Sequence, residues 1–239
     1  ETPAPDTVPQ LKSAKMRIVE NVTPHVWNYH LSVAPGSPWA DVRLRKALNL
    51  AIDREGIVAL LNGLARPAIG QVDPTSPWFG KPTFQIKYDP EAAKKLLAEA
   101  GYSKQKPLKT TFVIAQGGSG QMQPLPMNEL VKAQLESVGF RVKFEVLDWN
   151  ALLDLFFKGW ERAPTYDAIN ISLGSVDPVS GMISHFATAR RAPGGLNWGW
   201  FENKEFDELA VQAMNTFEPE KSLAMFTRLH EIVSEQAGR

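Results

Sequence analysis

The sequence predicts an α/β fold with a mixed, largely parallel sheet flanked by helices. Strand-like runs at 108–115, 140–147 and 167–173 alternate with helix-like runs at 127–138 and 149–158. This order requires crossover connections, which make the strands parallel and place helices over the sheet. The chain has 239 residues, 44% of them hydrophobic and 22% charged, which is typical of a globular protein with one large domain or two small ones.

Residues 41–63 predict two consecutive helices. The apolar positions of the first helix repeat at the spacing of a buried helix face: Val42, Leu44, Ala47, Leu48 and Ala51. Four polar residues lie off that face: Arg43, Arg45, Lys46 and Asn49. We expect the charged ones to be solvated or to contact a second lobe of the protein. Asp53 can cap the second helix, and Gly63 ends it.

The remaining elements follow from alternation and from capping residues. Residues 1–14 read as a linker, and the alternating runs 16–22 and 25–33 predict two half-buried strands. A helix begins after the N-cap Asp89 and ends at Gly101. Two further helices, 204–215 and 219–236, close the chain with no strand after them, so we expect a piece of a longer protein.

Charge and cysteine content exclude several classes of function. There are 26 basic and 26 acidic residues, and this neutral total argues against nucleic-acid or anionic-membrane partners, which need a basic excess or patch. The chain has no cysteine, which excludes disulfides and thiolate chemistry. No apolar run is long enough to span a membrane, and the first ten residues lack the features of a secretory signal peptide.

Three loops are candidate ligand-binding segments, because ligands of parallel sheets bind beyond the carboxyl ends of the strands. They are 116–120, 174–178 and 193–200. The first is glycine-rich but lacks a phosphate-loop lysine, so a flexible loop is its simpler interpretation. Asp177 is expected to cap a helix that begins at Pro178. For the tryptophans of the third loop, a ligand cleft and the core are both open.

No pattern indicates catalysis, a metal site or a cofactor. The histidines have no metal-ligand spacing, and no nucleophile elbow or singled-out carboxylate pair is present. Ordinary surface or core histidines are the expectation for all four: His25, His30, His185 and His230.

A set of segments resembles the family 5 extracellular solute-binding proteins, the binding components of ABC importers for peptides, nickel, opines and related solutes. The resemblance extends in order from residue 15 onward and is carried by Trp39–Arg54, Asn62–Pro67, Tyr88–Gly101, Leu135–Phe140, Ser175–Pro178 and Asn203–Leu209.

The resemblance implies one lobe of a type II periplasmic-binding-protein-like fold, in which solute is trapped between two lobes. Residues 15–239 would be the C-terminal ligand-binding lobe, with the N-terminal lobe and the final strands absent. It implies a periplasmic or extracellular monomer, a signal peptide in the full-length precursor and a cognate ABC permease as partner, with no nucleic acid, no enzyme activity and no cofactor. We expect seven cleft-facing residues: Gln116, Trp149, Ser172, Gly174, Ser175, Trp198 and Trp200.

The same resemblance bears on the solute. Family members that bind peptides hold the amino group with an acidic residue just before the Asp-Pro pair, and the matching position is Gly174. Relatives of the dipeptide-binding type also carry an arginine in the loop that matches 116–119. Buried charges need paired charges, so the solute is expected to be neutral or polar, such as a sugar, or a peptide held by its backbone.

Two alternatives remain open from the residues alone. A hydrolase could use Gly117–Gly120 as an oxyanion site, and would need a nucleophile with a base in reach. A protein-interaction domain could present exposed aromatic side chains to a partner, and would show an apolar surface patch with no cleft.

Overall fold

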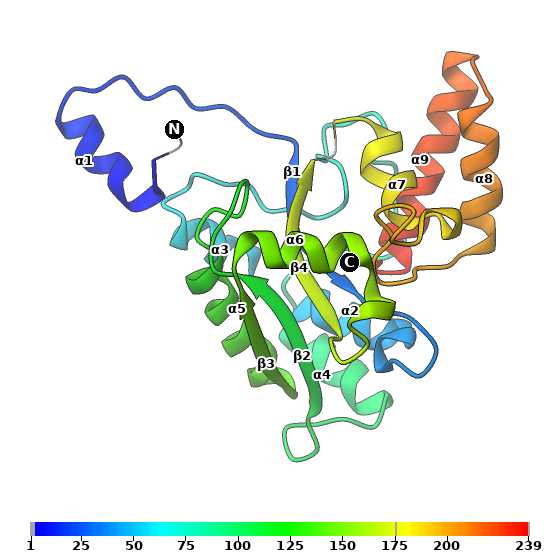
Figure 1. The fold of residues 1–239 in the computed structure, drawn as a ribbon, viewed down its shortest axis with the longest axis horizontal. Helices are drawn as coiled ribbons and strands as arrows, with labels where there is room; N and C mark the ends of the chain where they lie inside the picture. Colours follow the sequence, from blue (N-terminus) through cyan, green and yellow to red (C-terminus); the bar gives the residue numbers. More distant parts are fainter. Residues whose placement is uncertain (1–2, 175, 239) are drawn as a thin grey trace.

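The computed structural model describes residues 3–174 and 176–238, and its centre is a mixed sheet with the strand order β1-β4-β2-β3 (Figure 1). Strand β2 pairs in parallel with β3 and β4, and β1 pairs antiparallel with β4. The alternation of strands and helices therefore predicted the parallel part of the sheet correctly. The strands are β1 His25–Leu31, β2 Leu108–Ala115, β3 Phe140–Leu147 and β4 Ala168–Gly174.

Helices cover both faces of the sheet, with α6 on one face and α2, α4 and α5 on the other (Figure 1). The α-helices are α1 Val8–Ser13, α2 Val42–Ala51, α3 Arg54–Leu60, α4 Pro90–Glu99, α5 Pro124–Val138, α6 Trp149–Lys158, α7 Ser184–Phe186, α8 Lys204–Met214 and α9 Pro219–Glu235. Shorter turns are the 3-10 helices Pro5–Thr7, Pro38–Ala40, Trp160–Arg162 and Thr188–Arg190, and the π-helix Val179–Ile183.

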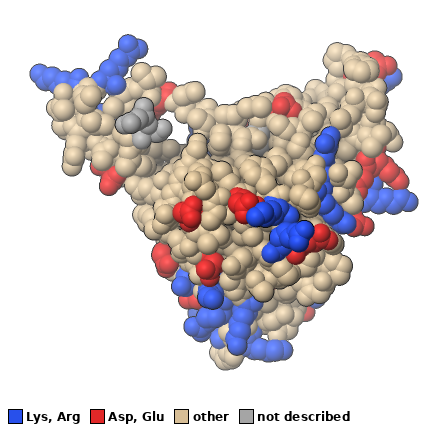
Figure 2. Space-filling view, viewed as in Figure 1, with Lys and Arg blue, Asp and Glu red and all other residues tan. Residues whose placement is uncertain are grey.

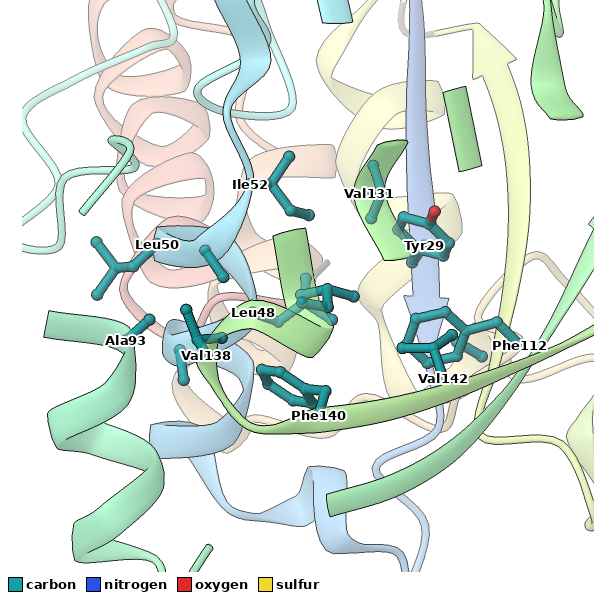
Figure 3. Close-up of a cluster of buried hydrophobic side chains, with 14 of the residues drawn as sticks. Tyr29, Leu48, Leu50, Ile52, Ala93, Phe112, Val131, Val138, Phe140 and Val142 are labelled. Carbon is teal, nitrogen blue, oxygen red and sulfur yellow. The ribbon is translucent and has the colours of Figure 1, made fainter. Parts of the chain in front are cut away.

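Successive side chains of β2 point to opposite faces of the sheet, as the two-residue period of a strand requires. Phe112 packs into the core beneath α2 and α5, where Figure 3 shows it near Tyr29 and Val142. Its neighbour Val113 packs on the other side with Leu152 of α6. The continuous apolar run of β2 thus reflects a strand that is buried on both faces.

The predicted helix pair at 41–63 is confirmed as α2 and α3. The Asp53 carboxylate accepts a hydrogen bond from the Gly56 backbone N–H at 3.0 Å, which caps α3. Gly63 follows the helix with φ +76°, a conformation that glycine adopts without strain. Helix α4 is likewise capped by Asp89, which accepts from the Ala92 N–H at 3.0 Å.

Two polar residues of α2 are buried, although the sequence placed them off the apolar face. Arg45 donates to the carbonyls of Trp39 at 2.6 Å and of Gln236 at 2.9 Å, so it joins α2 to the end of the chain. Asn49 accepts from the Arg54 guanidinium at 2.8 Å. For Arg45 the expectation of solvation or contact with a second lobe was wrong, because its guanidinium bonds to carbonyls of this same chain and the C-terminal segment packs over that side of the helix.

The alternating run 16–22 does not form a strand in this structure, and that prediction was wrong. The segment is extended and crosses open space between α1 and β1 (Figure 1). The side chains of Met16, Val19 and Val22 are 57%, 76% and 56% exposed. Alternation alone makes no strand, because backbone groups need a neighbouring strand to bond. Within the expected linker, α1 and the preceding 3-10 turn are helical.

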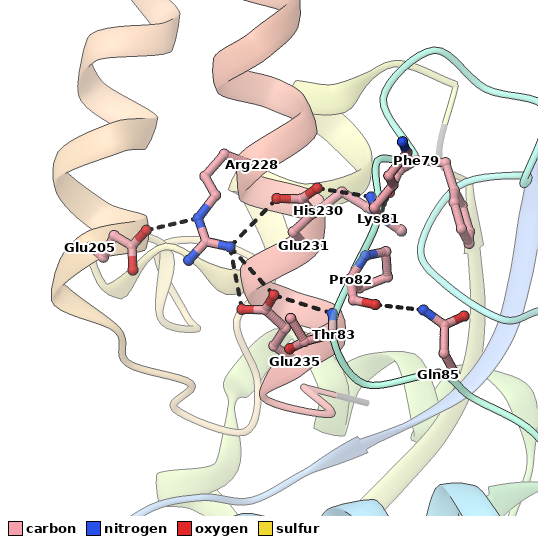
Figure 4. A network of polar contacts seen from close by, with 10 residues as sticks. All are labelled: Phe79, Lys81, Pro82, Thr83, Gln85, Glu205, Arg228, His230, Glu231 and Glu235. Atoms are coloured by element: carbon pink, nitrogen blue, oxygen red, sulfur yellow. Dashed lines mark hydrogen bonds and ion pairs between the residues drawn. The ribbon is translucent and has the colours of Figure 1, made fainter.

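Helices α8 and α9 form a hairpin with its own apolar cluster beside the sheet (Figure 1). A polar network attaches the long loop before α4 to α9 (Figure 4). In it, Glu231 accepts from the Lys81 N–H at 2.8 Å, and His230 Nδ1 lies 2.7 Å from the Phe79 carbonyl. Arg228 lies between Glu205, Glu231 and Glu235. Across 3–174 and 176–238, no helix is both long and apolar enough to cross a membrane.

Candidate functional site

The carboxyl ends of β2, β3 and β4 meet at one edge of the sheet, and β1 begins there because it runs antiparallel. We call this the carboxyl edge. His25, the first residue of β1, pairs with Gly174, the last residue of β4. Segment 116–123 leaves β2 at this edge, and Trp149 follows the end of β3. Residues far apart in the sequence therefore meet at the place where parallel sheets bind ligands.

Ser172 and His25 face each other at the carboxyl edge. Ser172 Oγ lies 3.4 Å from His25 Nδ1. Gln121 fixes the β4 backbone beside them, because its Oε1 accepts from the Ser172 N–H at 3.1 Å. The imidazole is exposed, whereas Gln121 and Ser172 are buried. The exposed His25 ring, which can form hydrogen bonds, thus lies over two buried polar side chains, those of Ser172 and Gln121.

The glycine-rich loop runs between two rings, which explains its composition. A Cβ on Gly118 would lie 2.4 Å from the Trp149 indole, and one on Gly120 would lie 2.9 Å from His25 Nδ1. Both glycines also have positive φ, +140° and +72°. A side chain at either position would displace a ring. A Cβ added to Gly117, in contrast, would have no atom within 4 Å.

A buried polar network supports the carboxyl edge from beneath. The Tyr29 hydroxyl donates to the Asn128 side-chain oxygen of α5. The Asn128 amide donates to the Asn170 side-chain oxygen at 3.1 Å, and the Asn170 amide donates to the Asn28 carbonyl at 2.9 Å. Buried polar groups that satisfy each other rigidify their surroundings. The network joins β1, β4 and α5 just below the Ser172 position.

Four of the seven expected site residues lie at the carboxyl edge. They are Gln116, which is exposed, Trp149 and Gly174, which are partly buried, and Ser172. The Gln116 N–H donates to the Leu147 carbonyl at 2.9 Å, which keeps the two strand ends together. Ser175 lies outside the described residues.

The two tryptophans of the third loop lie elsewhere. The Gly199 carbonyl accepts from the Val33 N–H at 2.7 Å, just beyond the end of β1, which is the opposite edge of the sheet. Six residue steps of β4, roughly 20 Å, separate the two edges. Trp198 is 0% exposed beneath α6, and Trp200 packs against Trp160 at 5.6 Å. The structure therefore does not bring Trp198 and Trp200 together with the other four.

His25 and Gln121 belong to the carboxyl edge, and the sequence reasoning missed them. His25 was expected to be an ordinary histidine because no motif surrounds it. The direction of β1 is what would have revealed it. Because β1 is antiparallel to β4, its first residue, His25, lies beside the carboxyl ends of the parallel strands. His30 and His185 contribute to packing, since their rings lie 5.7 Å apart in the core, and His230 belongs to the polar network of α9.

Two acids of the described chain follow strands at the carboxyl edge, and both cap helices. Asp148, after β3, accepts from the Asn150 N–H at 3.0 Å. Asp177, in segment 174–178 after β4, accepts from the backbone N–H groups of Ser180 at 2.9 Å and Val179 at 2.8 Å. The bonds from Ser180 lower the pKa of the Asp177 carboxyl below its ordinary value. Asp177 thus has the capping role that the sequence predicted. Within 3–174 and 176–238, no cluster of three or more His, Asp or Glu residues can hold a metal ion.

A separate groove of about 580 Å³ lies along α8, away from the strand ends. It is lined mainly by apolar residues, among them Ile183, Val211 and Met214, with Arg190 and Asp207 at its polar side. None of the expected site residues lines it.

Comparison with known sequences decides the family. The family model described as bacterial extracellular solute-binding proteins, family 5 Middle, matches residues 1–192. The chain belongs to this family. Membership confirms the resemblance carried by the segments from Trp39 onward, and the family description agrees with the expected periplasmic or extracellular location.

Individual relatives bind different solutes according to their names. The chain is 25% identical to di/tripeptide-binding protein 2 of Pseudomonas aeruginosa over 98% of this chain and 43% of that protein. It is 28% identical to heme-binding protein A of Haemophilus influenzae over 84% of this chain and 36% of that protein. The chain thus spans less than half the length of these relatives.

Solved structures confirm the fold class. HbpA2 from Haemophilus parasuis superposes with a TM-score of 0.84 at 19% identity, covering 100% of this chain and 46% of that one. AppA from Bacillus subtilis, in complex with a nonapeptide, superposes with a TM-score of 0.78 at 20% identity, covering 99% of this chain and 52% of that one. Both likenesses concern the fold alone.

Proposed function

We propose that residues 15–239 form the C-terminal ligand-binding lobe of a solute-binding protein that serves an ABC importer. The lobe holds a small polar solute or a peptide against a second lobe, and the closed protein delivers it to a permease. Closure requires that the solute binds the closed state more tightly than the open state. Family membership supports this role, and so does the convergence of an indole, a hydroxyl and an imidazole at the carboxyl edge.

The observation that carries the proposal is the convergence of Trp149, Ser172, His25 and the glycine loop at one edge. An indole beside hydroxyl, imidazole and backbone groups suits a polar organic solute that stacks on a ring and forms hydrogen bonds. Gln116 and Gly174 flank this surface.

The surface supports an uncharged contact with the solute. Gly174 has no side chain to hold an ammonium group, although a Cβ there would meet only the His25 ring, at ordinary distances of 3.6 Å from Nε2 and 3.9 Å from Cδ2. Segment 116–123 contains no charged residue. A sugar, or a peptide held by its backbone, is the solute class we propose for this lobe.

The proposed protein is a monomeric binding protein and not an enzyme. A hydrolase would need a nucleophile and a base in firm contact, with a third group to orient the base. Ser172 Oγ and His25 Nδ1 are 3.4 Å apart, and no described carboxylate bonds to His25. The pair suits recognition better than proton transfer.

The test is calorimetric titration of the complete gene product with sugars, peptides and metal chelates. For the solute that binds, Trp149→Ala is expected to weaken affinity about tenfold or more, as for an aromatic anchor. Trp160→Ala, at the opposite edge beside Trp200, is the matched control and should leave affinity within about twofold. Equal affinity losses in both variants, or full-strength binding by residues 15–239 alone, would refute the proposal.

A further inference from the structure

Five basic side chains gather at the edge of the sheet opposite the carboxyl edge. We call them the basic edge: Lys104, Lys106, Lys109, Arg141 and Lys143, all exposed. Figure 2 shows blue side chains grouped at the lower end of the molecule, where Figure 1 places the starts of β2 and β3. The neutral total charge of the chain conceals this local excess.

The backbone holds these residues together. A tight turn, in which Ser103 and Lys106 exchange backbone hydrogen bonds of 3.0 and 3.1 Å, presents Lys104 and Lys106. The turn rests on the start of β3, because a Cβ on Gly139 would lie 3.1 Å from the Ser103 carbonyl carbon. The cluster is therefore a fixed feature of the fold and not a chance position of mobile loops.

The pairing of β2 and β3 places like charges opposite each other. Lys109 is the register partner of Arg141, and Lys143 follows two residues later on the same face. Cross-strand pairs of like charge are destabilising. Acidic and basic side chains in alternation would keep this edge soluble without the repulsion. The concentration of positive charge therefore indicates a functional role.

None of the five residues is neutralised within the described chain. The ion pairs of the structure involve other cations, such as Arg43 with Asp41 and Arg228 with three glutamates. Two acids beside these strands bond to other groups: Asp167 accepts from the Thr111 N–H at 2.7 Å and the Thr110 hydroxyl at 3.2 Å, and Glu136 accepts from the Val142 N–H at 3.3 Å. The positive charge of the basic edge is thus available to a partner.

We propose that the basic edge binds an anionic lipid surface. Four of the five residues are lysines, which act as flexible point charges and need no fixed geometry in the partner. A protein partner would call for an aromatic or apolar centre, whereas the side chains between these cations are Gln105, Pro107 and Thr111. Diffuse positive charge without an anchor matches the surface potential of anionic lipid.

The position of the basic edge adds a functional consequence that does not depend on which solute is bound. Lys109 and Arg141 lie six residues before the ends of β2 and β3, and Lys143 lies four residues before the end of β3. A molecule adsorbed through the basic edge therefore presents its carboxyl edge away from the lipid, toward the surrounding medium. Adsorption concentrates the protein at the membrane while that edge stays accessible.

The test is co-sedimentation of this chain with vesicles of phosphatidylglycerol and phosphatidylcholine in equal parts, against phosphatidylcholine alone. We expect salt-sensitive binding to the anionic vesicles only. The triple variant Lys109→Gln, Arg141→Gln, Lys143→Gln should lower the partition coefficient about a hundredfold, at roughly fivefold per cation. The matched control changes three exposed lysines on other elements: Lys12→Gln, Lys204→Gln and Lys221→Gln.

The two triple variants carry the same net charge, so equal losses would overturn the proposal in favour of a non-specific charge effect. Equal binding to neutral vesicles would also overturn it, as would binding to polyglutamate without binding to vesicles, which would indicate an acidic protein partner. Thermal unfolding shows whether each variant is folded. The basic-edge variant should be no less stable than the wild type, because it loses a like-charge pair.

Discussion

Replacing Gly118 by alanine tests whether the glycine loop and Trp149 form one surface. The new Cβ would lie 2.4 Å from two atoms of the indole, and the residue has φ +140°. Either the loop moves or the ring rotates away. Backbone strain of this kind costs about 1–3 kcal/mol. The clash with the ring adds to this cost, so we expect Gly118→Ala to lower the free energy of unfolding by at least that amount in urea titrations followed by circular dichroism.

The loop supplies its own control. Gly117→Ala has nothing within 4 Å of the new Cβ and should change stability by less than about 0.5 kcal/mol. In a Trp149→Ala background the steric part of the Gly118→Ala cost should disappear, leaving only the backbone part, which a double-mutant cycle separates. If Gly118→Ala and Gly117→Ala proved equally stable, the packing of the loop against Trp149 would be refuted.

Three further predictions concern groups that support the fold. Tyr29→Phe leaves the buried Asn128 oxygen without its donor and should cost about 1–3 kcal/mol, whereas Tyr88→Phe, on the surface, should cost almost nothing in the same denaturation assay. Burial lowers the pKa of His230 below its ordinary 6.5, so below that pH the unfolded chain binds a proton that the folded chain does not. Stability should therefore fall as the pH drops through this range, and His230→Gln should flatten the dependence in urea titrations at several pH values. Asn203→Ala removes the cap of α8 and should cost about 1 kcal/mol, measured as a lowered urea midpoint with unchanged slope.

Local signals predicted the elements well where a residue type has one dominant structural role. Asp53 and Asp89 accept backbone hydrogen bonds from the first turn of the helices that they precede, and the strand–helix alternation predicted the parallel part of the sheet. The sequence around Arg45 was misleading for a tertiary reason. Its guanidinium bonds to a carbonyl at the far end of the chain, and no local pattern records that contact.

The candidate site was predictable only in part, for the same reason. Ser172 and Gly174 follow from the rule that ligands lie beyond parallel strands. His25 required knowledge that β1 is antiparallel, and Trp200 required knowledge that its loop returns to the opposite edge of the sheet. Segment 16–22 shows the opposite error. Its alternating pattern predicts a strand, but no strand forms there because no partner strand lies beside it.

The pairing of β1 with β4 has a consequence for the order in which this protein can mature. Residue 25 pairs with residue 174, so β1 has no partner until most of the chain has been synthesised or has crossed a membrane. Contacts between such distant segments form slowly, and an unpaired strand is open to wrong pairing in the meantime. The carboxyl edge is therefore completed late, and a chain interrupted before Gly174 would carry its tryptophan and glycine loop without the strand that aligns them with His25.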